Sequence, residues 1–552
     1  MKLTEQLAHT LLKNCKSVSP LKQIHAQIVR LNLYQDSSLV SSLVPLYASL
    51  SPRHIDCLFS SLCRHTPLYV LNQSIRLFSK TPSLCLQSLH LYLQMVRCNI
   101  KPDNYTYPFL LNSCAALLCL NHGAEVHGRV VKTGFCSVIE VSNTLIDMYG
   151  KCGELSCARQ VFDEMTQRDV VTYNALLGAH ARIGKDMSSA QMVFDQMTVR
   201  NLISWNAMVV GCVNSGDLDL ARAIFDQMSE RNDVTWTTML VGYTKNGLMD
   251  AARVLFDAMP EKTLICWTAM ISGYAQSGRP NEALECFRWM RLACVKPDAF
   301  AMTSVISALA QLARPDLAHW ITSLVDREGI ERNERVLTAL VDMHAKCGNI
   351  EEACQLFEEI SQPDVFPYSA LITGLASHGH GMRALEIFGR MQRAKVDPDY
   401  ITFVGVLNAC SHMGLVEDGL KYWESMINEY KIEPDADHYA CMVDMLGRAG
   451  RLEQAYKMVQ SMPMGPHPGA LGALLAACRT HYNVETAVDI AEVVAEELFK
   501  LEPSNTGNYV LLSGIYAARQ QWDEAARVRK AMKEKITTKV PGYSWVEAKP
   551  IR

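Results

Sequence analysis

The chain has 552 residues, of which 49% are hydrophobic, and a formal net charge of −4. This length is too great for one compact core, and the composition excludes a disordered chain. No apolar run reaches the roughly 18 residues that span a membrane, and the near-neutral charge counts against nucleic-acid binding driven mainly by Lys and Arg.

The nineteen cysteines are scattered through expected helices rather than clustered. Cys157, Cys212, Cys286 and Cys354 all fall at helical positions. Disulfide frames are typical of small secreted domains, so reduced thiols inside the cell fit this chain better.

The first thirty residues contain one arginine and an early glutamate, so they do not resemble a good transit peptide. They already resemble the repeats that follow. We therefore expect residues 1–67 to hold degenerate repeats, and this segment assigns no compartment.

A phenylalanine then recurs at nearly constant spacing. Phe162 and Phe194 are 32 residues apart, and three further steps of 31 reach Phe287. Related segments surround each one, such as GELSCARQVFDEM (153–165) and GDLDLARAIFDQM (216–228). Self-similarity at this period predicts a helical solenoid, which offers a long surface rather than one active site.

Residues 202–232 show what one repeat encodes. Ser204 to Val213 have helical spacing, and Gly216 can adopt the left-handed conformation that ends a helix. Asp217 can cap a second helix, in which Ala221, Phe225 and Met228 share a face. We expect this stripe to be core, with the phenylalanine filling the space between neighbouring hairpins.

The residues of a zinc deaminase are missing from the sequence. None of the sixteen histidines is followed two residues later by Glu, and there is no Cys-x-x-Cys. Walker-type phosphate loops, His-Glu-x-x-His and Gly-x-Ser-x-Gly are also absent. His378 and His380 fit a turn better than a metal site. We expect no catalytic residues, metal or cofactor.

Repeat lengths alternate in a recognisable way. Segments of 35 residues ending in VKPD (295–298) or VDPD (396–399) alternate with 31-residue segments such as 139–169. This mixture resembles the PLS subclass of the plant pentatricopeptide-repeat (PPR) family; the Trp-Leu-Gly-Tyr pattern of tetratricopeptide repeats is absent. The resemblance implies an all-α, right-handed superhelical solenoid of helix-turn-helix repeats, with a PLS-type array over 68–467.

The repeat types are assigned from this resemblance. L-type repeats begin near 5, 104, 299 and 400. P-type repeats begin near 68, 264 and 365. S-type repeats begin near 37, 139, 170, 202, 233, 334 and 436.

The last part of the chain departs from the repeats. NYVLLSGIYAARQQWDEAARVRKAMKE (508–534) and VPGYSWVE (540–547) resemble the E extension of the same family. We assign the helical extension to 468–539 and a C-terminal tail to 540–552. Longer relatives continue into a DYW deaminase domain near this point, so the resemblance places this chain in the E subgroup and predicts no catalysis.

The resemblance implies a site-recognition factor for C-to-U editing of single-stranded organellar RNA. Its partners would be a DYW-type deaminase in trans and small organellar editing-factor proteins. Mitochondrion is the expected compartment, with chloroplast as the alternative. Two other functions stay open: a factor for RNA splicing, stability or translation, and a protein-binding helical scaffold.

In this family the fifth and last residues of a repeat read one base. Uracil pairs are Asn72 with Asp103 and Asn143 with Asp169; cytosine pairs are Asn174 with Asn201 and Asn206 with Asn232. Guanine pairs are Thr268 with Asp298, Thr338 with Asp364, and Ser369 with Asp399. Thr303 with Asn333 indicates adenine. Thr237 with Thr263 is outside the usual combinations and predicts no base. Pro108 and Val404, fifth residues of L-type repeats, cannot read a base through their side chains.

The predicted RNA is 5′-U-n-U-C-C-n-G-(A)-G-G-n-n, starting from the repeat at 68. The competing interpretation is helix capping, because Asn, Asp, Ser and Thr are preferred at helix starts.

Two further positions recur in the repeats. The hydrophobic residues at the second position would flank the bases or simply pack: Val171, Ile203, Val234, Ile265 and Phe366. The basic residues at the thirteenth position would track phosphates or form a solvated stripe: Lys151, Arg182, Lys245, Lys346 and Arg448.

Overall fold

The computed structural model describes residues 5–15, 17–31, 33, 37–50, 67–184, 187–463 and 465–535. Over these residues the chain is all-α, with no strand. It divides into two compact units, 1–269 and 270–552, which are considered separately. The tail at 540–552, with its VPGYSWVE motif, lies outside the described residues.

The first unit contains α1 (Glu5–Lys13), α2 (Val18–Arg30), α3 (Ser37–Leu50), α5 (Leu68–Ser79), α6 (Cys85–Arg97), α7 (Thr106–Ala116), α8 (Leu120–Thr133), α9 (Ile139–Lys151), α10 (Leu155–Glu164), α11 (Val170–Ile183), α12 (Met187–Asp195), α13 (Leu202–Ser215), α14 (Leu218–Gln227), α15 (Asp233–Lys245) and α16 (Met249–Ala258). Helix α17 (Leu264–Gln276) runs across the boundary between the units.

The second unit contains α18 (Pro280–Leu292), α19 (Ala299–Leu312), α20 (Pro315–Arg327), α21 (Glu334–Lys346), α22 (Ile350–Glu358), α23 (Val365–Ser377), α24 (Gly381–Arg393), α25 (Tyr400–Met413), α26 (Val416–Asn428), α27 (Ala436–Arg448), α28 (Leu452–Gln460), α29 (Pro468–Thr480), α30 (Ala487–Leu501), α31 (Thr506–Ala518) and α32 (Trp522–Lys535).

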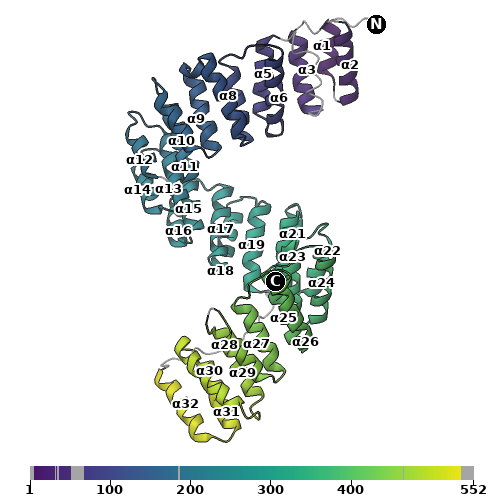
Figure 1. Cartoon of the computed structure of the whole chain (residues 1–552), viewed down its shortest axis with the longest axis vertical. Coiled ribbons are helices and arrows are strands. Elements are labelled where there is room, and N and C mark those ends of the chain that lie inside the picture. The colour runs from purple at the N-terminus through teal and green to yellow at the C-terminus, as the bar shows by residue number, and fades with distance from the viewer. Residues whose placement is uncertain are drawn as a thin grey trace. The chain divides into compact units, whose positions relative to one another are not determined.

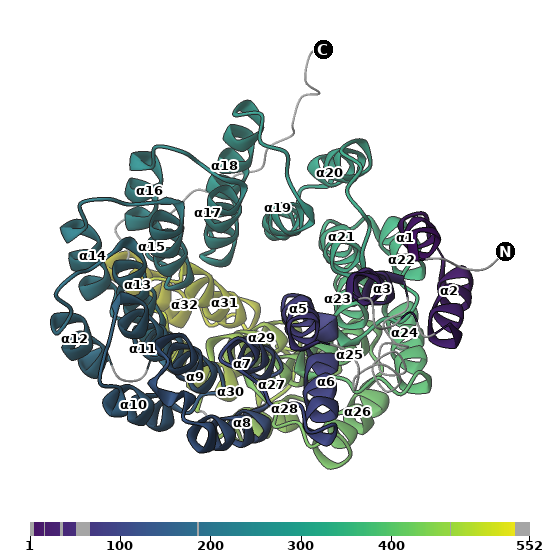
Figure 2. The same ribbon diagram turned by 90° about the horizontal axis from the view of Figure 1, so that it is seen from above.

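Within each unit the helices form hairpins that stack in chain order (Figure 1). The first helix of each hairpin packs on the first helix of the next, as α9 on α11 and α21 on α23. Figure 2 shows that, within the first unit, first helices such as α9 and α11 lie in one layer and second helices such as α10 and α12 in another. The same holds within the second unit for α21 and α23 against α22 and α24. The predicted solenoid of helical hairpins is therefore confirmed.

The Ala–Phe–Met stripe forms the core between hairpins, as the sequence predicts. Ala221, Phe225 and Met228 are all buried. The Phe225 ring meets the edge of Trp236 in the next hairpin, with centroids 4.9 Å apart. The same T-shaped contact joins Phe194 to Trp205 and Phe256 to Trp267. One aromatic pair per interface thus sets how closely successive hairpins approach.

The predicted turn of this repeat is confirmed, but the predicted first helix is too short. Gly216 ends α13 with φ of 82°, a conformation that favours glycine. Asp217 then caps α14 by accepting a hydrogen bond from the Leu220 backbone N–H at 2.9 Å. Helix α13 extends beyond Ser204 to Val213 at both ends, because it begins after its cap Asn201 and continues to the residue before Gly216.

The described cysteines are all free thiols, in agreement with the predicted reduced state. Among the described residues, no group of His, Cys, Asp and Glu side chains has a metal-binding arrangement. No described helix is both long and apolar enough to cross a bilayer.

Candidate nucleic-acid interface

The two predicted cytosine pairs are hydrogen-bonded pairs at the junction of successive hairpins. The Asn174 Nδ2 donates to Asn201 Oδ1 at 3.1 Å, and the Asn206 Nδ2 donates to Asn232 Oδ1 at 3.2 Å. Each last residue also caps the next helix through the same Oδ1. The cap uses only Oδ1, and the Nδ2 of Asn201 makes no hydrogen bond to any residue that the structure describes.

The predicted uracil pairs have the same arrangement with a carboxylate as the second member. The Asn72 Nδ2 lies 3.0 and 3.1 Å from the two carboxylate oxygens of Asp103. The Asn143 Nδ2 donates to Asp169 Oδ1 at 3.3 Å. Burial alone would raise the pKa of Asp169, but hydrogen bonds from Thr172, Asn143 and Val171 lower it overall. The carboxylate is thus ionised at neutral pH and available as an acceptor.

A buried hydroxyl, which the sequence analysis did not single out, connects several of these pairs. The Ser204 Oγ donates to Asn174 Oδ1 at 2.6 Å, and the Thr235 Oγ1 donates to Asn206 Oδ1 at 2.6 Å. Each hydroxyl belongs to the third residue of the helix that the last residue caps. Its sequence signal is the capping box that Ser204 forms with Asn201.

The threonine pairs are arranged differently. The Thr303 and Thr338 hydroxyls donate to carbonyls of their own helices, those of Ala299 at 2.7 Å and Glu334 at 2.8 Å. Their partners Asn333 and Asp364 cap α21 and α23, and no hydrogen bond joins either pair within the described residues. The structure places these pairs at the expected helix starts without linking them.

The remaining three pairs differ from one another. Ser369 Oγ donates to Asp399 Oδ1 at 3.0 Å. Thr237 and Thr263 meet only through Cys266, whose Sγ lies 3.5 and 3.2 Å from their hydroxyls. Thr268 belongs to the first unit, whereas Asp298 belongs to the second and caps α19.

The second-position side chains are exposed rather than packed. Val171, Ile203 and Val234 are 58, 63 and 56% exposed. Ile265 and Phe366 are each 62% exposed. The interpretation that these five side chains pack in the core is therefore wrong. An apolar side chain repeated at one exposed position in successive hairpins leaves a row of surfaces without a partner among the described residues.

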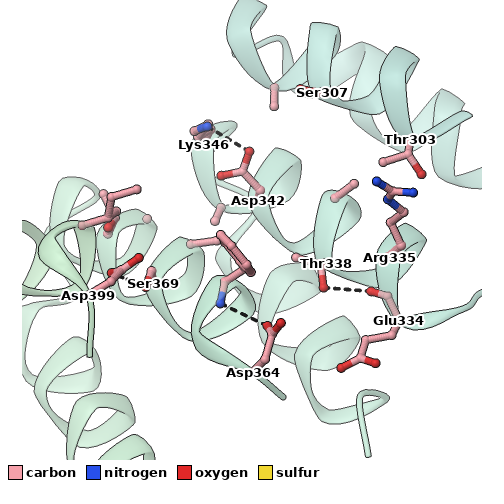
Figure 3. Close-up of a pocket in the computed structure, with 18 of the residues that line it drawn as sticks. Thr303, Ser307, Glu334, Arg335, Thr338, Asp342, Lys346, Asp364, Ser369 and Asp399 are labelled. Carbon is pink, nitrogen blue, oxygen red and sulfur yellow. Dashed lines mark hydrogen bonds and ion pairs between the residues drawn. The ribbon is translucent and has the colours of Figure 1, made fainter. Parts of the chain in front are cut away.

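Part of this surface in the second unit is hollowed into a groove of about 980 Å³ (Figure 3). It runs over α19, α21, α23 and the start of α25. Its lining includes Thr303, Asn333, Thr338, Asp364, Ser369, Asp399, Lys346 and Phe366. Residues of three successive repeats that the sequence assigns to base and phosphate contacts thus share one continuous surface.

The basic residues of the thirteenth position are mostly paired with carboxylates. The Lys151 Nζ lies 2.6 Å from Asp147 Oδ2, and Arg182 also approaches Asp147, at 3.6 Å. Lys346 and Arg448 each pair with the aspartate four residues earlier, both at 2.8 Å. Lys245 has no ion pair within the described part of the chain. The positive charge of this stripe is therefore partly neutralised.

Models of protein families match much of the chain. The PPR repeat model matches residues 140–170, 203–233, 234–264, 335–362, 401–430 and 437–464. The PPR repeat family model matches 262–311 and 363–412, and the E motif model matches 483–547. Each of the six PPR repeat matches begins one residue after a start assigned from the sequence.

Similar proteins are known from Arabidopsis thaliana and maize. Pentatricopeptide repeat-containing protein At3g29230 of A. thaliana is 44% identical over 97% of this chain and 89% of its own length. At2g20540 of A. thaliana is 35% identical over 98% of this chain and 89% of its own length. The crystal structure of PPR10 from maize aligns with a TM-score of 0.53 at 19% identity, covering 96% of this chain and 86% of PPR10.

Proposed function

Because the chain belongs to the pentatricopeptide-repeat family and carries an E motif, we propose that it binds single-stranded organellar RNA and selects sites for C-to-U editing. Repeats with polar fifth and last residues contact one base each through these two side chains. The observation that carries this proposal is the hydrogen-bonded pair that recurs at the same position in four repeats.

The free atoms of the asparagine pairs complement cytosine. The Oδ1 of Asn174 accepts from Ser204, and the Oδ1 of Asn201 is used by the cap and by Asn174. Both residues then keep N–H donors for a ligand, whereas their oxygens are already hydrogen-bonded. Cytosine presents two adjacent acceptors, O2 and N3, on its Watson–Crick edge, which unstacked bases in single strands expose.

The Asn–Asp pairs complement uracil by the same reasoning. Asn143 offers a donor, and Asp169 offers an ionised carboxylate whose Oδ1 is occupied by the cap while Oδ2 is free of it. Uracil carries an N3–H between two carbonyl oxygens, so it can donate to the carboxylate and accept from the amide. Cytosine lacks that N–H and would leave the carboxylate unpaired, which costs binding free energy.

The exposed second-position side chains supply apolar surfaces on which bases can stack. Val171, Ile203 and Val234 lie next to the pairs at 174, 206 and 237 along the first layer of helices. Contacts between the faces of bases and apolar side chains contribute to affinity without depending on which base is present, because every base has an apolar face. This term supports affinity in a chain whose net charge is −4.

The E motif supports recruitment of a DYW-type deaminase in trans, with small organellar editing-factor proteins as further partners. Relatives named chloroplastic and mitochondrial support an organellar location. We propose the mitochondrion, with the chloroplast as the alternative. Maize PPR10 has been solved in complex with an 18-nt PSAJ RNA element, which supports RNA as the ligand of this fold.

The test is binding of the full chain to 5′-U-n-U-C-C-n-G-A-G-G-n-n and to two altered RNAs. One altered RNA replaces the two central cytosines, and the other replaces the three guanines. Each replacement should weaken binding by roughly tenfold or more per position, as for a good hydrogen-bonded base contact. Equal binding of all three RNAs would contradict base reading and favour a protein-binding scaffold. Selective binding without any editing defect in plants would favour splicing, stability or translation.

A further inference from the structure

Several repeats are followed, three positions after their last residue, by a fully buried hydroxyl; this position is called the third position below. Ser204, Thr235 and Thr106 are each 0% exposed. They donate to the fifth residue of the preceding repeat, Asn174, Asn206 and Asn72, at 2.6, 2.6 and 2.7 Å. These contacts join residues 29 to 34 positions apart in sequence.

The geometry around Ser204 favours one orientation of the Asn174 amide. The Ser204 Oγ accepts a hydrogen bond from the Asn201 backbone N–H at 3.3 Å, and its own proton has two acceptors in reach, Asn174 Oδ1 at 2.6 Å and Asn201 Oδ1 at 3.0 Å. A rotation of the amide by 180° would lose the shorter of these two contacts, because an amide nitrogen does not accept. It would also place Asn174 Oδ1 against Asn201 Oδ1, two acceptors with no proton between them.

We propose that the serine or threonine at this third position is a positioning residue for base selection. It fixes which end of the fifth residue's amide faces the RNA, and repeats without it are less selective. The inference rests on the proposed function, since it concerns how the same surface chooses between bases.

Several repeats of this chain lack a serine or threonine at the position of Ser204. The residue corresponding to Ser204 is Val336 after the repeat at 299 and Pro367 after the repeat at 334. In both repeats the fifth residue, Thr303 or Thr338, bonds to its own helix instead. After the repeat at 233 it is Cys266, whose thiol is a weak donor. We expect the RNA positions facing these three repeats to discriminate between bases less strongly than the two cytosine positions do.

Thr172 provides a matched control. It forms the same capping box with Asp169 that Ser204 forms with Asn201. It makes no hydrogen bond to the fifth residue, and the buried Oδ1 of Asn143 has no partner in the described structure. Replacing Thr172 by alanine therefore removes the capping-box bond from the Asp169 backbone N–H to the hydroxyl without removing an amide contact, whereas replacing Ser204 removes both kinds of bond.

The test compares full-length Ser204→Ala, Ser204→Thr and Thr172→Ala with the unchanged chain. Each is titrated with the predicted RNA carrying C or U at its third, fourth and fifth positions in turn. In Ser204→Ala the preference for C over U should fall, by as much as roughly tenfold, at the fourth position, because the Asn174 amide loses one of the two hydrogen bonds that orient it and U binds better to the turned amide. The fifth position, read by Asn206 and Asn232, should be unaffected.

Ser204→Thr should keep the preference, since it keeps the hydroxyl. Thr172→Ala should keep the preference for U over C at the third RNA position. Its thermal stability should fall about as much as that of Ser204→Ala, because both variants lose the hydroxyl of a capping box. An unchanged preference at the fourth position in Ser204→Ala would overturn this inference alone. If the chain without any substitution shows no base preference at any position, the proposed function is overturned as well.

Discussion

Lys346 and Asp342 form an ion pair on the groove side of α21, with Nζ and Oδ2 2.8 Å apart (Figure 3). The pair places a carboxylate beside a cation that the sequence assigns to RNA phosphate. The aspartate and the phosphate compete for the same ammonium group. The ion pair therefore reduces the share of binding that is independent of RNA sequence.

Removing that carboxylate should strengthen RNA binding without changing base preference. Asp342→Asn frees Lys346 for phosphate, so affinity should rise for matched and unmatched RNA alike. The slope of log affinity against log salt should steepen by about 0.7. Asp418→Asn is the control, because Asp418 pairs with Lys421 on α26, a second helix outside the groove. A rise confined to the matched RNA would contradict the account.

Lys245 should contribute more to RNA affinity than Lys151. Both occupy the thirteenth position of an S-type repeat, but Lys151 pairs with Asp147 at 2.6 Å and Lys245 has no ion pair in the described structure. Phosphate must displace Asp147 to reach Lys151. Titration of Lys245→Ala and Lys151→Ala with one RNA at several salt concentrations measures the difference. A larger loss for Lys151→Ala would indicate that the ion pair positions the cation rather than neutralising it.

The substitution Asn201→Asp should change the preferred base at the fourth RNA position from C to U. It converts the pair with Asn174 from two donors into a donor and an ionised acceptor, as in the Asn143–Asp169 pair. Asp also caps helices well, so α13 should remain stable. Competition binding with the four bases at that position measures the change, and the fifth position serves as the internal control. Retained preference for C would exclude the last residue as a reader.

Phe225→Ala should destabilise the hairpins on either side of it. The buried ring contacts Trp236 at 4.9 Å between centroids, and Arg231 lies 4.7 Å above its centre. Loss of such a ring costs about 3–5 kcal/mol. Hydrogen exchange is the appropriate measurement, since a repeat array does not unfold in two states. Protection should fall in α14 and α15, while Val254→Ala, at a side chain 68% exposed, should leave it unchanged.

Acidification should destabilise the repeats around α21. Burial, against an opposing effect of Glu352 and with a smaller contribution from nearby His319, lowers the pKa of His344 to about 4. The unfolded chain binds the proton near pH 6.5, so His344 favours the fold above that pH. This contribution falls by as much as about 3 kcal/mol as the pH drops from 6.5 to 4.

Urea unfolding of the second unit at pH 7 and pH 5 measures this effect. His344→Gln should flatten the difference between the two pH values, because glutamine does not titrate. His378→Gln, at an exposed histidine, should not. An equal response of both variants would assign the acid sensitivity to other groups.

The repeat architecture could be predicted from sequence because its signals are local and recur. The period of Phe162, Phe194 and Phe225 fixes the hairpin, and Gly216 with Asp217 fixes its turn. The contact of Ser204 with Asn174 could not be predicted in this way. A capping box reports only a local bond, whereas this contact depends on how α11 and α13 stack.

The hydrogen bonding of the threonines at the fifth position also could not be predicted from the sequence pattern. Thr338 shares its position with Asn206, yet its hydroxyl bonds back to its own helix, as helical threonines can. By contrast, the pairing of Lys346 with Asp342 could have been inferred, because the two residues are four positions apart on one helix.

The most direct test of the account is sequencing of mitochondrial and chloroplast RNA from a plant that lacks this chain. The account predicts loss of C-to-U conversion at one or a few sites in one organelle, each preceded by 5′-U-n-U-C-C-n-G-A-G-G-n-n within a few nucleotides. Intact editing at every site, with altered transcript ends, unspliced introns or no RNA change, would contradict it.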